Sequence, residues 1–162
     1  MTEKLEILKK LMPSAVLRAM TPEARMAVSQ MLIVEGLVPL TRFPFRVGRE
    51  LRVKIVDGRV ERIERVKGEN EQQNNELYLI DNAAQLNVSI EHFQIERDGN
   101  SFYLYDRGSE LGTVVEEVQV GGADGEATTV LNDGDTITIG AKQSPYVFQF
   151  ILLDGFEVQS SL

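Results

Sequence analysis

The sequence predicts an all-β fold in which many short strands stack into a sandwich or a barrel, preceded by a short helical segment. Two observations carry this prediction. Beyond Gly36, apolar residues recur with a period of two, which places every second side chain of a strand on one face. The apolar runs are also short, turn sequences such as Asp57-Gly58 separate them, and no helical pattern lies between them.

Residues 1–36 are predicted to form a helical extension that precedes the β domain. Leu5, Leu8 and Met12 follow the spacing of three and four residues that is typical of an amphipathic helix. The pattern then breaks, and Ser14 is suitably placed to cap a short second helix.

A further helix is predicted within residues 21–36. Thr21 is a suitable N-cap, Pro22 suits the first helical position, and Gly36 suits the C-terminal end. The apolar stripe of this helix consists of Met20, Ala24, Ala27, Met31 and Leu32. The extension either packs on its own domain or pairs two copies of the chain, and the sequence leaves both alternatives open.

Residues 37–156 are predicted to form the β domain, and residues 157–162 a tail. An insertion at 51–76 consists of a hairpin about Asp57-Gly58, a strong signal for a two-residue turn, and of a polar loop over 67–75. The later strands are expected in the runs ELYLI, HFQIE, SFYLY, GTVV, EVQV, TTVL, TITIG and YVFQFILL. Their expected core residues are Phe93, Ile95, Phe102, Leu104, Ile137, Ile139, Phe148, Phe150 and Leu152.

The composition excludes several kinds of site. Cysteine is absent and His92 is the only histidine, so a disulfide framework and a thiolate or histidine-rich metal site are excluded. No apolar run approaches the ~18 residues of a membrane span, and the N-terminal residues lack the apolar core of a signal peptide. We therefore expect a cytoplasmic protein that uses no metal or cofactor and does not bind membranes.

Charge is unevenly distributed along the chain. The net charge of −8 argues against non-specific binding to nucleic acid. Residues 42–67 nevertheless hold nine Lys or Arg against four Asp or Glu, a local net charge of +5. This basic segment is either a set of solvated strand faces or an end of the fold that attracts an anion.

Five short motifs occur in an order and spacing that resemble a forkhead-associated (FHA) domain, over roughly residues 38–153. They are VGR (47–49), NVSIEHFQI (87–95), DRGSELGTVV (106–115), LNDGDTITIG (131–140) and YVFQFILL (146–153). The resemblance implies a sandwich of two mainly antiparallel β-sheets. It also implies a signalling module that binds phosphothreonine peptides through loops at one end of the sandwich.

The resemblance assigns roles to the matched residues. It implies that Arg49 contacts the phosphate or the nearby peptide backbone, which suits a guanidinium because its charge is permanent and its donors form a fixed fork. It implies that Ser89 donates its hydroxyl to a phosphate oxygen, and that Gly48 allows the backbone turn that aims Arg49. Structural roles in the loops fall to His92, Gly112 and Thr113.

Four further residues are expected to line the peptide site: Ser109, which matches the family pattern, and Ile90, Glu110 and Leu111, which depart from it. Leu111 stands where the family commonly has asparagine, and it lacks that residue's donor and acceptor. A carboxylate on Glu110 facing a phosphate costs roughly 1 kcal/mol of binding in a water-like dielectric. That penalty disappears if Glu110 points to solvent, or if Arg107 or Arg46 neutralises it.

Two binding functions remain open. The first is a phosphothreonine reader with atypical flanking selectivity, whose partner is a phosphorylated substrate of a Ser/Thr kinase. The second is a degenerate FHA domain that binds a partner, or itself, independently of phosphorylation through an apolar patch of Ile90 and Leu111. An enzyme is not expected, because Ser89 and His92 lie three residues apart at the start of a strand, where their side chains do not obviously meet.

Overall fold

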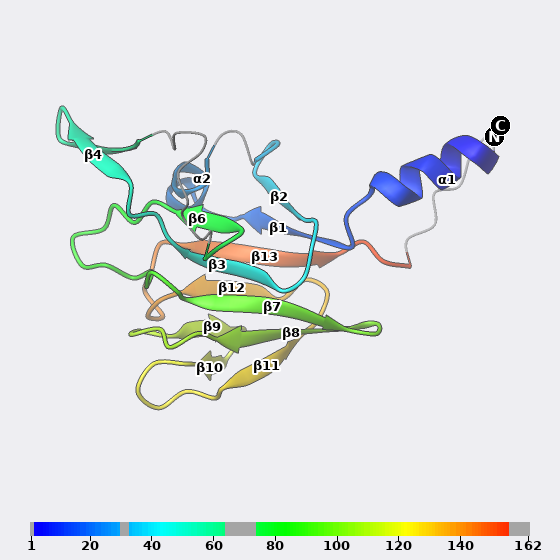
Figure 1. Cartoon of the computed structure of the whole chain (residues 1–162). Helices are drawn as coiled ribbons and strands as arrows, with labels where there is room; N and C mark the ends of the chain where they lie inside the picture. Colours follow the sequence, from blue (N-terminus) through cyan, green and yellow to red (C-terminus); the bar gives the residue numbers. More distant parts are fainter. Residues whose placement is uncertain (1, 30–32, 64–73, 156–162) are drawn as a thin grey trace.

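The computed structural model describes residues 2–29, 33–63 and 74–155, which form a two-sheet sandwich with a separate hairpin (Figure 1). The six-stranded sheet, in the order β10-β9-β12-β13-β1-β2, contains β1 (Ala15–Ala19), β2 (Leu37–Leu40), β9 (Thr113–Val115), β10 (Val118–Val120), β12 (Thr136–Ile139) and β13 (Val147–Leu152). The five-stranded sheet, in the order β11-β8-β7-β3-β6, contains β3 (Phe45–Arg49), β6 (Leu77–Leu79), β7 (Phe93–Asp98), β8 (Ser101–Asp106) and β11 (Thr128–Leu131). The hairpin consists of β4 (Val53–Val56) and β5 (Arg59–Arg62), and the helices are α1 (Thr2–Leu11) and α2 (Pro22–Ala27).

The strand pairing confirms the predicted sandwich of two mainly antiparallel sheets. Within the described residues, β3 and β6 form the one parallel pair of strands, in a register that sets Arg49 opposite Leu79. All eight runs that were expected to be strands after the insertion contain one, from β6 to β13. The short turns between them explain why neighbouring strands along the chain are also neighbours in a sheet, as in β7–β8 and β9–β10.

The core lies between the two sheets and follows the predicted alternation. Eight of the nine expected core residues are buried: Phe93, Ile95, Phe102, Leu104, Ile137, Ile139, Phe148 and Phe150. Leu152 is only partly buried and packs against the edge of this core. The rings of Phe102 and Phe150 meet across the sandwich with their centroids 5.4 Å apart. Burial of this apolar surface is the main force that holds the two sheets together.

The prediction of a helix after Ser14 is wrong, because residues 15–19 form strand β1. β1 pairs with β13 on one side and with β2 on the other. Ala15 and Leu17 are at most 1% exposed, so the sheet buries this segment as completely as the core strands. The strand neighbours on both sides override the helical tendency of its Ala and Leu residues. The sandwich therefore begins at Ala15 rather than at residue 37.

The helix expected within residues 21–36 is shorter than predicted. Thr21 is its N-cap, since its side-chain oxygen accepts a hydrogen bond from the backbone nitrogen of Ala24 at 3.1 Å, and Pro22 opens the helix as expected. Helix α2 ends at Ala27, because Val28 is already extended and buried. Gly36 has φ +81° and lies in the turn before β2, not at the end of a helix. Two residues of the expected stripe, Met31 and Leu32, lie outside the described residues.

The insertion contains the predicted hairpin. Asp57 and Gly58 both have positive φ, +49° and +76°, as a type I′ turn between β4 and β5 requires. Of the expected polar loop, residues 67–73 lie outside the described residues, as does the predicted tail. Asn75, at the end of that loop, is 2% exposed and belongs to the frame of the candidate site.

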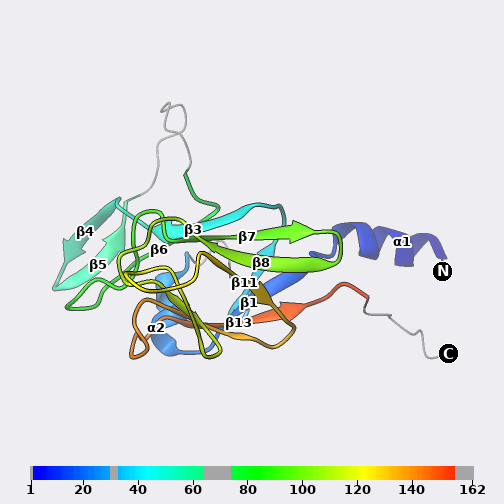
Figure 2. The same ribbon diagram turned by 90° about the horizontal axis from the view of Figure 1, so that it is seen from below.

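Helix α1 projects from the sandwich (Figures 1 and 2). It buries no residue, and Leu11 is 78% exposed. The helix is attached at Ser14, whose carbonyl accepts a hydrogen bond from the backbone nitrogen of Leu153 at 2.9 Å. In both views α1 lies at the end of the sandwich opposite the hairpin and the loops that follow β3 and β8. No helix in the described part of the chain is long and apolar enough to cross a membrane.

Candidate functional site

Arg49 is the last residue of β3, at the end of the sandwich where the loops gather. Its backbone nitrogen donates to the carbonyl of Ser89 at 3.0 Å, and its Nε donates to the carbonyl of Val88 at 2.9 Å. These two bonds hold the arginine against the loop that contains Ser89. The two Nη groups make no hydrogen bond or ion pair with any described residue, so they remain available to an anion.

Gly48 is needed for a different reason from the one the sequence suggested. It lies within β3 and not in a turn. A Cβ atom at this position would lie 1.9 Å from the carbonyl oxygen of Ile90 and 2.5 Å from Nδ2 of Asn75. The same two groups form a hydrogen bond of 3.0 Å with each other. The absence of a side chain at Gly48 therefore lets the Ser89 loop lie directly on β3.

The site has three loops: the first follows β3, the second joins β6 to β7, and the third joins β8 to β9. Ser89 joins the second loop to the third. Its Oγ accepts a hydrogen bond from the backbone nitrogen of Glu110 at 3.0 Å. Its hydroxyl hydrogen has no acceptor among the described residues, so it is available to a ligand. The backbone bond from Arg49 to Ser89 and the bond from Glu110 to Ser89 bring three separate segments of the chain to one place.

His92 is structural, as the resemblance implied. It is fully buried, and its Nδ1 accepts a hydrogen bond from the backbone nitrogen of Ser89 at 2.9 Å. The proton is therefore on Nε2, which donates to the carbonyl of Gly112 at 2.8 Å. Burial lowers the pKa of His92 and favours this neutral form. Neither ring nitrogen contacts a serine hydroxyl, so His92 is not placed to activate one as a nucleophile.

The third loop turns Ser109 inward. The Ser109 hydroxyl donates to Oδ1 of Asp106, and the backbone nitrogens of Gly108 and Ser109 donate to Oδ2 at 2.9 and 3.2 Å. Ser109 is 6% exposed, so the expectation that it faces a peptide is wrong: burial and its bond to Asp106 place it in the frame of the loop. An aspartate that binds the backbone two and three residues ahead is a common turn device.

Gly112 and Thr113 complete the frame of the third loop. Gly112 has φ +76°, and a Cβ atom there would lie 2.7 Å from the carbonyl oxygen of Val120. Both the backbone conformation and the close approach of β10 therefore require glycine. Thr113 is fully buried, and its hydroxyl has no hydrogen-bond partner among the described residues.

Three residues around Arg49 and Ser89 present their side chains to solvent. Ile90 is 43% exposed, Leu111 is 38% exposed, and Glu110 is exposed as well. Ile90 directly follows Ser89, and Glu110 and Leu111 belong to the segment that hydrogen-bonds to the Ser89 hydroxyl. Arg49 and Ser89 are thus bordered by two apolar side chains and one carboxylate.

The cations expected to neutralise Glu110 have other partners. Glu76 accepts hydrogen bonds from Arg46 and from Arg42, with shortest contacts of 2.7 and 3.1 Å. Burial by itself raises the pKa of Glu76, but the bonds from the two arginines outweigh this effect and lower the pKa to about 2. Arg107 forms its ion pair with Glu91 at 3.1 Å. Two arginines of the basic segment, Arg42 and Arg46, therefore share the one carboxylate of Glu76.

Asp81, which belongs to none of the five motifs, holds the second loop in place. Its carboxylate accepts hydrogen bonds from the backbone nitrogens of Ala83, Asn87 and Val88 at 3.1, 2.5 and 2.8 Å. Because the Val88 carbonyl binds Nε of Arg49, Asp81 also positions the arginine indirectly. An aspartate at the start of a polar loop is the signal that could have identified it.

Comparison with known proteins identifies the family. The profile of the FHA domain matches residues 45–140, more than half of the chain. The FHA domain of CT664 from Chlamydia trachomatis is 16% identical, with a TM-score of 0.50 over 88% of this chain and 98% of that one. The FHA domain of an Arabidopsis thaliana hypothetical protein is 22% identical, with a TM-score of 0.52 over 92% of this chain and 93% of that one.

A third similar structure contains a ligand. Mycobacterium tuberculosis EmbR, in complex with a low affinity phosphopeptide, is 19% identical, with a TM-score of 0.50 over 97% of this chain and 31% of EmbR. At these identities the three structures show a common fold. The match to a family profile is to a binding domain, and it identifies no catalytic domain. A search of curated proteins finds no match.

Proposed function

Because the chain belongs to the FHA domain family, a family of phosphothreonine-binding modules, we propose that it binds phosphothreonine-containing peptides through Arg49 and Ser89. The observation that carries the proposal is the pairing of two unused donors at one place. The Nη groups of Arg49 have no partner among the described residues, and neither does the hydroxyl hydrogen of Ser89. The backbone bond of 3.0 Å between the two residues fixes them side by side.

The chemistry of these donors suits a phosphate. A phosphothreonine carries about −1.5 to −2 charges at neutral pH and has three strong acceptor oxygens. A guanidinium presents parallel donors that match two phosphate oxygens, and hydrogen bonds to charged groups contribute roughly 1.5–3 kcal/mol. Because Nε of Arg49 is already fixed by Val88, little side-chain freedom is lost when a phosphate binds.

A second candidate function has support from the surroundings of this site. Glu110 is exposed beside Ser89, and no described cation neutralises it. Ile90 and Leu111 present apolar surface at the same place. These features favour binding of a partner without phosphate, through an apolar contact in place of an anionic one. The two functions differ in whether affinity depends on phosphorylation.

The test is an array of threonine peptides, each synthesised with and without phosphate. We expect a subset to bind only when phosphorylated, as in a protein that recognises the substrates of a Ser/Thr kinase. The variant Arg49→Ala abolishes this subset, whereas Arg18→Ala, which removes an exposed arginine on β1, retains it. Binding of both forms of each peptide with equal affinity would favour the second candidate and exclude the first.

We also propose that α1 pairs two copies of the chain. No residue of α1 is buried, its apolar residues Ile7, Leu8 and Leu11 are exposed, and a helix of ten residues is marginal in water by itself. Its first half carries Glu3 and Glu6 beside Lys4, and its second half carries Lys9 and Lys10. An antiparallel pair of such helices therefore sets opposite charges against each other. Its position at the far end of the sandwich leaves both peptide sites open.

A further inference from the structure

A groove of about 590 Å³ lies on the outer face of the five-stranded sheet. Its lining residues are Phe43 and Pro44 from the segment before β3, Glu96, Arg97 and Asp98 from β7, and Tyr103 and Tyr105 from β8. The turn from β7 to β8 lies at the end of the sandwich where α1 is attached, away from Arg49 and Ser89 (Figures 1 and 2). We propose that this groove binds a basic segment of a partner protein through arginine side chains, a contact that needs no phosphate.

The alternation along β7 and β8 places the groove on the outside of the sandwich. Ile95 is buried in the core, so Glu96, the next residue of β7, lies on the opposite face of the sheet. Leu104 is buried in the same way, and its neighbours Tyr103 and Tyr105 lie on the outer face. In Figure 2, α2 lies beside β13, away from β3 and β7, and α1 projects beyond the sandwich. Neither of the two described helices therefore covers this face.

The carboxylates of the groove have no cationic partner among the described residues. Glu96 accepts a hydrogen bond from the neutral amide of Gln94 at 3.0 Å, and the Asp98 side chain makes no bond with any described residue. Arg97 also lines the groove, but it pairs with Asp154 at 2.7 Å. The groove therefore presents negative charge that a cation of a partner can neutralise.

The tyrosine rings favour arginine as that cation. Tyr103 and Tyr105 have ring centroids 6.4 Å apart, with the ring planes tilted by 54°. A cation within about 6 Å of a ring centroid is attracted by the ring face, and arginine occupies such places more often than lysine. Glu96 is directly opposite Tyr103 in the pairing of β7 and β8. Because a guanidinium is planar, it can stack on a tyrosine ring while its N–H groups donate to a neighbouring carboxylate.

The groove repeats its features at the spacing of an extended peptide. Glu96 and Asp98 are two residues apart on β7, as are Tyr103 and Tyr105 on β8. Side chains two residues apart in an extended chain lie on one face, about 7 Å from each other. An extended segment along these strands therefore sets two arginines, at positions i and i+2, against the two carboxylates. Val130, opposite Tyr103 on β11 and 47% exposed, offers apolar surface to the carbon chain of an arginine.

The test is an NMR titration of the full chain with the unphosphorylated peptide Ser-Gly-Arg-Gly-Arg-Gly-Ser. The matched probe has citrulline, which carries no charge, in place of both arginines. We expect the arginine peptide to shift the amide signals of β7, of β8 and of Phe43, and the citrulline peptide to leave them in place. Glu96→Gln and Tyr103→Ser each lower the affinity about two- to fivefold, whereas Tyr103→Phe, which keeps the ring, retains it.

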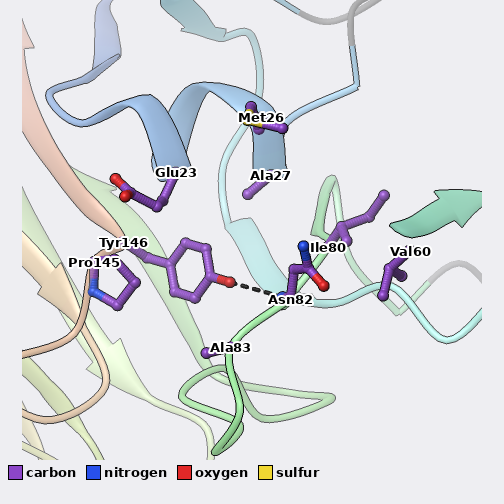
Figure 3. A pocket seen from close by; sticks show the side chains of 9 residues that line it. All are labelled: Glu23, Met26, Ala27, Val60, Ile80, Asn82, Ala83, Pro145 and Tyr146. Atoms are coloured by element: carbon purple, nitrogen blue, oxygen red, sulfur yellow. Dashed lines mark hydrogen bonds between the residues drawn. The ribbon is translucent and has the colours of Figure 1, made fainter. Parts of the chain in front are cut away.

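The controls separate this groove from the phosphate site and from a general attraction of basic peptides to an acidic protein. Glu23→Gln removes an exposed carboxylate at a separate pocket of about 160 Å³, which Pro145 and Tyr146 also line (Figure 3), and leaves the affinity for the arginine peptide unchanged. Glu96→Gln and Tyr103→Ser retain phosphopeptide binding, because neither residue lies at the phosphate site.

Four results would overturn the proposal and leave the proposed function untouched. The first is an arginine peptide that causes no shifts, and the second is a set of shifts spread over the acidic surface. The third is equal binding of the citrulline peptide or of a lysine version of the peptide. The fourth is wild-type affinity in both Glu96→Gln and Tyr103→Ser.

Discussion

The substitution Gly48→Ala tests how the site is assembled. The added Cβ atom would lie 1.9 Å from the Ile90 carbonyl oxygen, whereas ordinary contacts begin near 3.4 Å, so the loop must move by about 1.5 Å. That movement disrupts three hydrogen bonds of about 3.0 Å: Asn75 to Ile90, Arg49 to Ser89, and His92 to Val47. With each contributing roughly 0.5–1.5 kcal/mol, we expect the free energy of unfolding to fall by about 2–4 kcal/mol.

The assay for Gly48→Ala is urea unfolding followed by circular dichroism, together with titration of a phosphopeptide. The affinity for the phosphopeptide falls as well, because Arg49 and Ser89 are no longer held next to each other. The matched control is Gly99→Ala, where a Cβ atom meets nothing within 4 Å but φ is +61°. We expect this control to lose about 1 kcal/mol of stability and no affinity. Equal losses of stability in the two variants, with binding intact in both, would refute the role assigned to Gly48.

Three further predictions concern the borders of the site, the ion pairs and the projecting helix. The double variant Glu110→Thr, Leu111→Asn binds the phosphopeptide more tightly, as measured by calorimetry, because it removes a carboxylate whose repulsion of the phosphate costs roughly 1 kcal/mol of binding. Unchanged affinity would mean that these positions do not face the ligand. The folded pKa of Glu76 is about 2 against an ordinary 4.5, so its contribution to stability is present above pH 4.5 and is lost as the pH falls toward 2. Glu76→Gln therefore shows a shallower loss of melting temperature over that interval, and identical slopes would contradict the ion-pair account. Leu8→Asp abolishes pairing of the chain in sedimentation experiments without a change in melting temperature, and a wild-type chain that is monomeric at every concentration would exclude the pair.

The strands of the sandwich could be predicted because their signal is local. A period of two and short turns specify β7, β8 and β13 without reference to the rest of the chain. Strand β1 could not be recognised in this way. Its five residues AVLRA include good helix formers, and only the pairing with β13 and β2 makes them a strand.

The residues of the candidate site show the same difference between a local signal in the sequence and a contact made only in the folded chain. Motifs of a few residues were enough to single out Arg49, Ser89 and His92, which the folded chain brings together. The partner of Arg46 could not, because Glu76 lies 30 residues away and meets it only in the folded chain. Ser109 was misassigned for a similar reason: a serine in a turn faces either solvent or its own loop, and the nearby carboxylate of Asp106 decides between them.

The central claim is that Arg49 and Ser89 together recognise a phosphate. The most direct measurement is the ratio of dissociation constants for one peptide with threonine and with phosphothreonine, determined for the wild type, Arg49→Ala and Arg18→Ala. If the charge-assisted bonds contribute roughly 1.5–3 kcal/mol, the phosphorylated peptide binds about 10- to 100-fold more tightly to the wild type and to Arg18→Ala. In Arg49→Ala the ratio falls close to one. A wild-type ratio near one for every peptide, or an undiminished ratio in Arg49→Ala, would contradict the claim.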